Sequence, residues 1–174
     1  MVNGKKRAIG ISFLLMALLI GVVSAYVYET GNVAVTQTVK NIATLTVQNS
    51  ALGDIEEGQN IDYTKATVAS LGNIFTLTTT KDDVYLHFNS DIDSLSTYYS
   101  TYTITVKYAA VGAGSAYSVG DVACTMTLAA PDPSDVTLDK LGSWAFDYEI
   151  STTAKSVSSD QATSATTIVT AEST

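Results

Sequence analysis

Three stretches of the chain alternate between apolar and polar side chains, a pattern typical of strands with one buried face. In residues 98–109 the apolar positions are Tyr102, Ile104, Val106 and Tyr108. In residues 121–130 they are Val122, Cys124, Met126 and Leu128. In residues 143–152 they are Trp144, Phe146, Tyr148 and Ile150. Because successive side chains of a strand point to opposite faces, we predict antiparallel sheets packed on a shared core.

Other runs of β-branched and aromatic residues predict further strands. These runs cover residues 33–40, 42–48, 64–70, 73–79, 84–89 and 166–171. Glycine-rich or acidic loops separate them at 49–62, 89–97 and 111–120, and no helical periodicity follows residue 28. This spacing predicts an all-β fold, an antiparallel β-sandwich of jelly-roll-like type, in residues 41–174.

The N-terminus has the pattern of an export signal. Basic residues at 5–7 precede an uncharged, apolar stretch that reaches Val23, and small residues follow up to Ala25. This order is typical of a signal peptide over residues 1–25 that is cleaved after Ala25. The mature chain then begins at Tyr26, and residues 26–40 form an extended N-terminal strand.

Two other interpretations of this segment remain open. Residues 8–28 are long enough to cross a bilayer as an uncleaved anchor. A prepilin leader cut after the basic residues would instead leave the apolar stretch as the packing helix of a type IV pilin. Residues that favour strand over helix, such as Val33, Val35 and Thr36, argue against that second interpretation.

The charge of the chain excludes nucleic acid as a partner, and its single Cys and single His restrict disulfides and zinc sites. From residue 26 onward the chain has 6 Lys, no Arg and 17 acidic residues, a net charge of −11. Such a body lacks the basic surface that binds nucleic acid. One Cys excludes an internal disulfide framework, and one His with one Cys excludes most zinc sites built from this chain alone.

Candidate catalytic residues each have a simpler structural interpretation. His87 lies between Leu86 and Phe88 and is predicted to point to solvent, without a fixed nucleophile or acid beside it. Cys124 is predicted to be an inert core thiol. The acidic loops match no twelve-residue calcium loop. We therefore predict no enzyme activity, no catalytic or metal-binding residues and no cofactor.

The extended segment after the predicted cleavage site is the candidate subunit interface. Its apolar positions are Tyr26, Val27, Tyr28, Val33 and Val35. A strand at a chain end can complete the sheet of a neighbouring copy, and a head-to-tail contact that does not close produces a fibre. The alternative is that this segment is the first strand of its own sheet.

Several short motifs carry a resemblance to a family. After the apolar start come Ala43-Thr44-Leu45-Thr46-Val47, a loop over residues 50–58 with Leu52 and Gly53, and the strand Phe75-Thr76-Leu77-Thr78. In this order the chain resembles the TasA and camelysin family of secreted fibre proteins and similar archaeal bundling pili. It is poorer in Lys and lacks the long insertions of the bacterial members. The resemblance implies a jelly-roll-like subunit that polymerises by donor-strand insertion into bundled extracellular fibres.

The predicted function is a structural subunit of an extracellular filament, such as a bundling pilus or a biofilm matrix fibre. Its expected partners are other copies, joined head to tail, and neighbouring filaments that bundle through Thr- and Tyr-rich outer faces. It is expected to meet a membrane only during export. The alternatives are a type IV pilin-like subunit and a secreted carbohydrate-binding or enzymatic β-domain.

Overall fold

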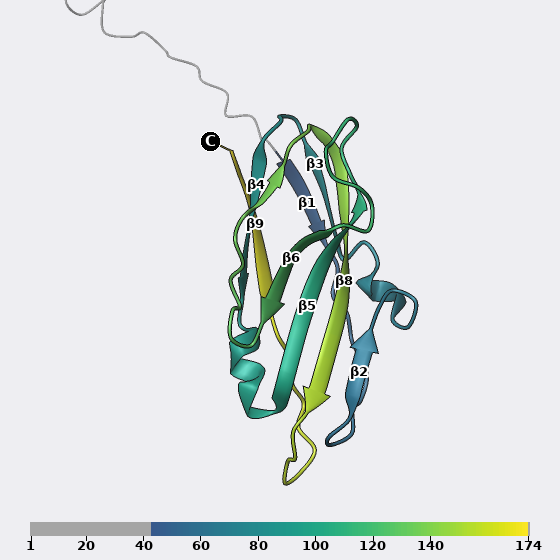
Figure 1. Cartoon of the computed structure of the whole chain (residues 1–174), viewed down its shortest axis with the longest axis vertical. Coiled ribbons are helices and arrows are strands. Elements are labelled where there is room, and N and C mark those ends of the chain that lie inside the picture. The colour runs from purple at the N-terminus through teal and green to yellow at the C-terminus, as the bar shows by residue number, and fades with distance from the viewer. Residues whose placement is uncertain (1–42, 174) are drawn as a thin grey trace, which may run out of the picture. The chain divides into compact units, whose positions relative to one another are not determined.

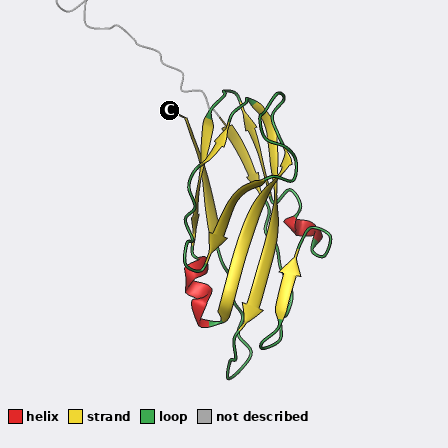
Figure 2. Cartoon of the chain, viewed as in Figure 1, coloured by secondary structure: helices red, strands yellow, loops and turns green. Residues whose placement is uncertain are grey.

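Nine strands and two short 3-10 helices follow one another in residues 43–173, the part of the chain that the computed structural model describes (Figures 1 and 2). The strands are β1 (Ala43–Val47), β2 (Asn60–Tyr63), β3 (Phe75–Thr79), β4 (Val84–Ser90), β5 (Tyr99–Ala110), β6 (Val122–Thr127), β7 (Val136–Leu138), β8 (Gly142–Ala154) and β9 (Thr167–Ser173). The helices are η1 (Ala69–Leu71) and η2 (Ile92–Thr97). Within these residues no helix is both long and apolar enough to span a membrane. The predicted strand 33–40 lies outside them.

The strands form two antiparallel sheets. The larger sheet has the order β1-β3-β8-β5-β6, with β2 also paired to β8, and the smaller has the order β7-β4-β9. The long strand β8 is central, because it pairs with β3 and β2 on one side and with β5 on the other. This architecture confirms the predicted all-β, antiparallel sandwich.

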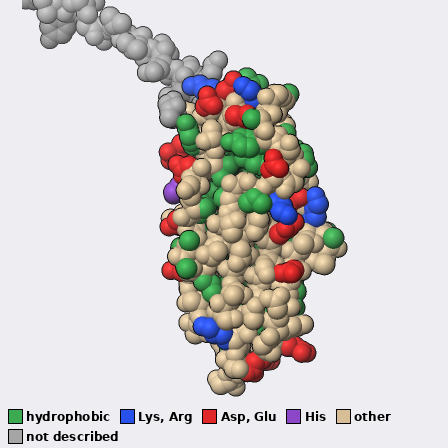
Figure 3. Space-filling model, viewed as in Figure 1, with side chains coloured by type: hydrophobic (Ala, Val, Ile, Leu, Met, Phe, Trp, Pro, Cys, Tyr) green, Lys and Arg blue, Asp and Glu red, His purple; other side chains and the backbone are tan. Residues whose placement is uncertain are grey.

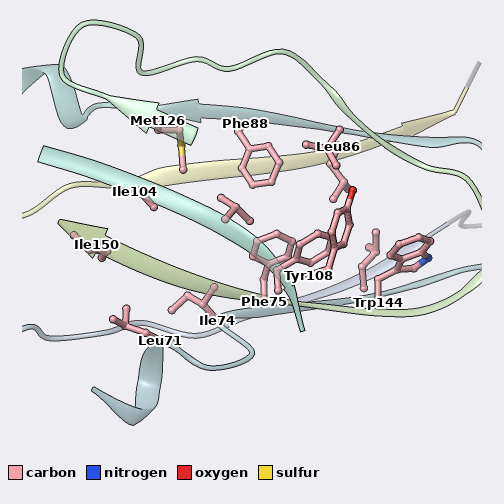
Figure 4. Close-up of a cluster of buried hydrophobic side chains, with 14 of the residues drawn as sticks. Leu71, Ile74, Phe75, Leu86, Phe88, Ile104, Tyr108, Met126, Trp144 and Ile150 are labelled. Carbon is pink, nitrogen blue, oxygen red and sulfur yellow. The ribbon is translucent and has the colours of Figure 1, made fainter. Parts of the chain in front are cut away.

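The core is the layer of side chains between these strands (Figure 4). In β5 and β8 the predicted alternation holds, since Ile104, Val106 and Phe146 are almost fully buried. The rings of Phe75 and Phe146 stack with centroids 4.4 Å apart, and Phe88 from the smaller sheet meets Phe75 edge-on at 5.8 Å. These aromatic contacts join β3 and β8 to β4.

The predicted strand 64–70 is wrong. Residues 64–68 form turns, in which the Val68 amide donates to the Thr64 carbonyl, and η1 follows at once. The Thr67 hydroxyl accepts from the Thr64 amide, so a local side-chain bond replaces strand pairing at this point. The strand that pairs with β8 here is β2, whose first three residues the prediction placed in the loop 49–62.

Three side chains lie differently from the alternation, and one of them is Ala145, which was predicted on the wet face of β8 but is only 8% exposed. Val122, predicted to face the core, is 55% exposed, because the β5–β6 ladder shifts register between Val106 and Lys107. Asp147, predicted on the wet face of β8, is only 8% exposed. Its carboxylate accepts from Lys65 Nζ at 2.6 Å and from the Asn73 amide at 2.8 Å, which compensates for its removal from water.

Candidate functional site

The residues predicted for the interface and for cleavage lie outside the described part of the chain. They are Ala25, Tyr26, Val27, Tyr28, Val33 and Val35. What the structure does describe is the surface that such a strand would have to join, namely the sheet edges of residues 43–173. Among these, the edge strand β9 differs from its neighbour β4 in how well its side chains are covered.

The strand β9 closes the smaller sheet on one side. It pairs with β4 along its whole length, from Ser90 opposite Thr167 to Val84 opposite Ser173. Within the described residues this is its only ladder. On its outward side β9 is therefore an edge where a further antiparallel or parallel strand could hydrogen-bond.

The inward side chains of β9 are less buried than their ladder partners on β4. On β4 the inward side chains Leu86 and Phe88 are 0% exposed. Their ladder partners on β9, Ala171 and Val169, pack against the same core but stay only partly buried. Ile168, on the opposite face of β9, is 60% exposed. An added strand at this edge would remove apolar surface from water.

The edge also lacks the features that usually prevent strand addition. Natural edge strands are protected by prolines, lysines, bulges or inward-pointing charges. The β9 sequence Thr-Ile-Val-Thr-Ala-Glu-Ser contains one charged residue, Glu172, and neither lysine nor proline. Its seven-residue ladder with β4 has no bulge. This strand is thus suited to pairing with another segment.

His87 lies on the outer face of the smaller sheet, as predicted. Its ring Nδ1 lies 2.8 Å from Oδ1 of Asp135, a residue just before β7. Both side chains are about half exposed. The hydrogen bond to Asp135, aided by the nearby carboxylates of Asp132 and Glu172, raises the pKa of His87 above 6.5. Among residues 43–173 the structure gives the ring one hydrogen-bonding partner, the Asp135 carboxylate, and the two groups form an ion pair when the imidazole is protonated.

The contribution of the His87–Asp135 ion pair to stability should depend on pH. The His87 pKa, followed by NMR of the ring protons, is expected to exceed 6.5 and to fall toward 6.5 in Asp135→Asn. Because the folded pKa is raised, the pair's stabilising contribution is complete below pH 6.5 and is lost as the pH rises through the folded pKa. An unchanged His87 pKa in Asp135→Asn would contradict the assigned cause.

The structure also places the candidate thiol and the loop carboxylates. Cys124 faces the core from β6, and burial raises its pKa to about 12, so the thiol is not activated as a nucleophile. In residues 43–173 no group of three or more His, Cys, Asp or Glu side chains is arranged to hold a metal ion. Asp139, Asp82 and Asp91 instead accept hydrogen bonds from the backbone amides of loop residues.

The tyrosines of β5 pack within the chain. Tyr102 is 8% exposed and meets Tyr99 edge-on at 5.1 Å. The Tyr99 hydroxyl hydrogen-bonds to that of Thr163 at 3.0 Å. Tyr108 is buried between Tyr117 and Phe146. The outer face of the larger sheet is consequently rich in threonine rather than tyrosine.

Sequence reasoning did not identify β9 as the exposed edge. Its residues were predicted as a strand, but the order of strands in a sheet depends on pairings between distant segments, which a single sequence does not display. The absence of lysine and proline was the available signal. The chain matches no family model, and no curated protein matches it.

Proposed function

We propose that this protein is a structural subunit that assembles head to tail into an extracellular filament. In this proposal the segment 26–36 of one copy pairs with the edge of β9 in the next copy. The observation that carries the proposal is the incompletely covered, unprotected edge of β9, whose inward side chains Val169 and Ala171 are only partly buried.

The lengths of the two segments are compatible. Eleven extended residues span roughly 36 Å, whereas the seven residues of β9 span roughly 23 Å. The donor segment has Val33 and Val35 two residues apart, with the small Ala34 between them and the polar Asn32 and Thr36 on either side. Placed beside β9, one face of the donor would extend the apolar surface formed by Val169 and Ala171, and main-chain hydrogen bonds would supply affinity.

Removal of residues 26–36 from the mature chain tests the proposal. The shortened chain is expected to stay monomeric, because it keeps the β9 edge but lacks the strand that joins it. A synthetic peptide of residues 26–36 should then bind it. At about 100 times its dissociation constant, the peptide would contribute roughly 2.7 kcal/mol and raise the melting temperature by about 10 °C.

Matched controls separate pairing from unspecific adhesion. A peptide carrying Val33→Asp and Val35→Asp keeps its length but would bury charge beside Val169, so little stabilisation is expected. Filaments of normal appearance from the shortened chain would refute the proposal. So would a soluble monomer of the complete mature chain at high concentration.

A further inference from the structure

The outer face of the larger sheet is a broad surface of hydroxyl side chains. Side chains that point away from the core on β1, β3, β5, β6 and β8 are mostly threonine or serine: Thr44, Thr46, Thr76, Thr78, Thr101, Thr103, Thr105, Thr125, Thr127, Ser143, Ser151 and Thr153. Figure 3 shows a wide tan area over β5 and β8, with carboxylates mainly toward its margins. The surface is uncharged over most of its extent, and below we call it the hydroxyl face.

Strand register arranges these hydroxyls in rows. Thr127 lies opposite Thr103, which lies opposite Ser151, so one row crosses three strands. The next row contains Thr125 and Thr105. Strands about 4.8 Å apart place these side chains next to one another, which gives rows of short methyl and hydroxyl groups, with long side chains at Lys107 and Glu149. Such a surface loses little side-chain entropy when another surface covers it.

The charges on the hydroxyl face cancel one another. Lys65 pairs with Asp147 at 2.6 Å, and Lys107 pairs with Glu149 at 2.7 Å. Asp62, on the neighbouring β2, adds one carboxylate at the margin. The remaining excess of acid therefore lies elsewhere on a body with a net charge of −11. Two copies consequently repel one another least when these faces meet.

The partly exposed Lys107–Glu149 ion pair also favours a second copy as the partner. In a two-fold contact each surface meets itself, so the Lys107 side chain of one copy can lie near the Glu149 carboxylate of the other. A nucleic acid or an acidic protein would find no net positive charge here. The hydroxyl face is thus electrostatically complementary to its own copy.

We propose that the hydroxyl face is the lateral docking surface between copies of this chain in neighbouring filaments. The inference rests on the proposed function, because filaments repeat the contact. Five strands of about eight residues cover roughly 650 Å², less than the roughly 800 Å² per partner of a stable complex. A single contact is therefore weak, and repetition along two filaments makes it effective.

Charge substitution on this face tests the inference. A variant with Thr103→Glu, Thr105→Glu and Thr125→Glu should form single filaments at the wild-type rate but at least tenfold fewer bundles in electron micrographs. The control variant carries Asn89→Glu and Thr137→Glu on the outer face of the smaller sheet and Ser134→Glu just before β7, all of them off the β9 edge. It receives the same added charge and should bundle like the wild type. Circular dichroism melting verifies that both variants fold.

A complementary variant makes the test independent of general repulsion. Thr103→Lys, Thr105→Lys and Thr125→Lys should restore mixed bundles when combined with the Glu variant. Equal loss of bundling in the control, unchanged bundling of the Glu variant, or wild-type bundling only with added polysaccharide would overturn the inference. If wild-type chains form no filaments, the proposed function fails. Association between Lys and Glu variant monomers in sedimentation then supports this surface, and its absence overturns it.

Discussion

Replacing Phe146 with alanine is expected to lower the free energy of unfolding by about 3–5 kcal/mol. The ring is 0% exposed. It stacks on Phe75 at 4.4 Å and touches Tyr108 at 5.2 Å, so its removal leaves a cavity between β3, β5 and β8. Urea unfolding of the variant and the wild type, followed by tryptophan fluorescence, measures the difference.

Ile168→Ala is the control for that substitution. Ile168 is 60% exposed on β9, so its truncation should change the unfolding free energy by no more than about 0.5 kcal/mol. A loss of less than 1 kcal/mol in Phe146→Ala would show that the aromatic cluster does not stabilise the sandwich as described.

Asp147→Ala is expected to cost about 2 kcal/mol of stability. The carboxylate accepts from the Asn73 amide at 2.8 Å and thereby holds a turn in which Asn73 has a φ of 48°. The same carboxylate pairs with Lys65 at 2.6 Å. Its loss releases the segment between β2 and β3 from the central strand β8. Thermal unfolding followed by circular dichroism measures the cost.

Two further variants divide this effect between its causes. Asp147→Asn keeps an oxygen acceptor for the Asn73 amide but loses the ion pair, so it should be milder than Asp147→Ala. Lys65→Met should be the mildest, because Lys65 is 62% exposed and surface ion pairs contribute little. A Lys65→Met variant as unstable as Asp147→Ala would assign the effect to the ion pair instead.

The long strands were predictable because alternation over many residues is a strong signal. In β5 the buried series from Tyr102 to Tyr108 was recognised in full, and in β8 the series from Trp144 to Ile150 was recognised except for the burial of Asp147. That burial depends on Lys65, which lies 82 residues away in the sequence. A contact at that separation leaves no mark in the local pattern.

The short elements were missed for a different reason. The strand β7 has three residues, too few to display a period, and β2 has four within an acidic, glycine-containing stretch. Both are strands because a longer neighbour, β4 or β8, supplies the pairing partner. Conversely, residues 64–70 have β-branched composition, but the local hydrogen bonds of Thr64 and Thr67 stabilise a turn instead.

Of the two parts of the candidate site, only the N-terminal segment could be predicted from the sequence. The apolar residues of segment 26–36 are visible in the printed sequence, and their role as a donor strand remains a prediction. Neither the β9 edge nor the hydroxyl face follows from one sequence, because both depend on the order and register of strands. The threonines of β5 were predicted correctly on its outward face, and Tyr102 and Tyr108 were predicted correctly on its buried face.

The pairing of β4 with β9 has a consequence for how the molecule is made. Ser90 and Thr167 hydrogen-bond to each other across a separation of 77 residues. Strands β2 and β3 likewise pair with β8, which is synthesised much later. For most of its synthesis, the nascent chain therefore exposes apolar surfaces whose partner strands have not yet been made. Such topologies fold slowly, on a scale of milliseconds to seconds, and are prone to premature sticking. A chaperone that keeps the nascent chain from associating with other chains until its last strand emerges would raise the yield of native molecules.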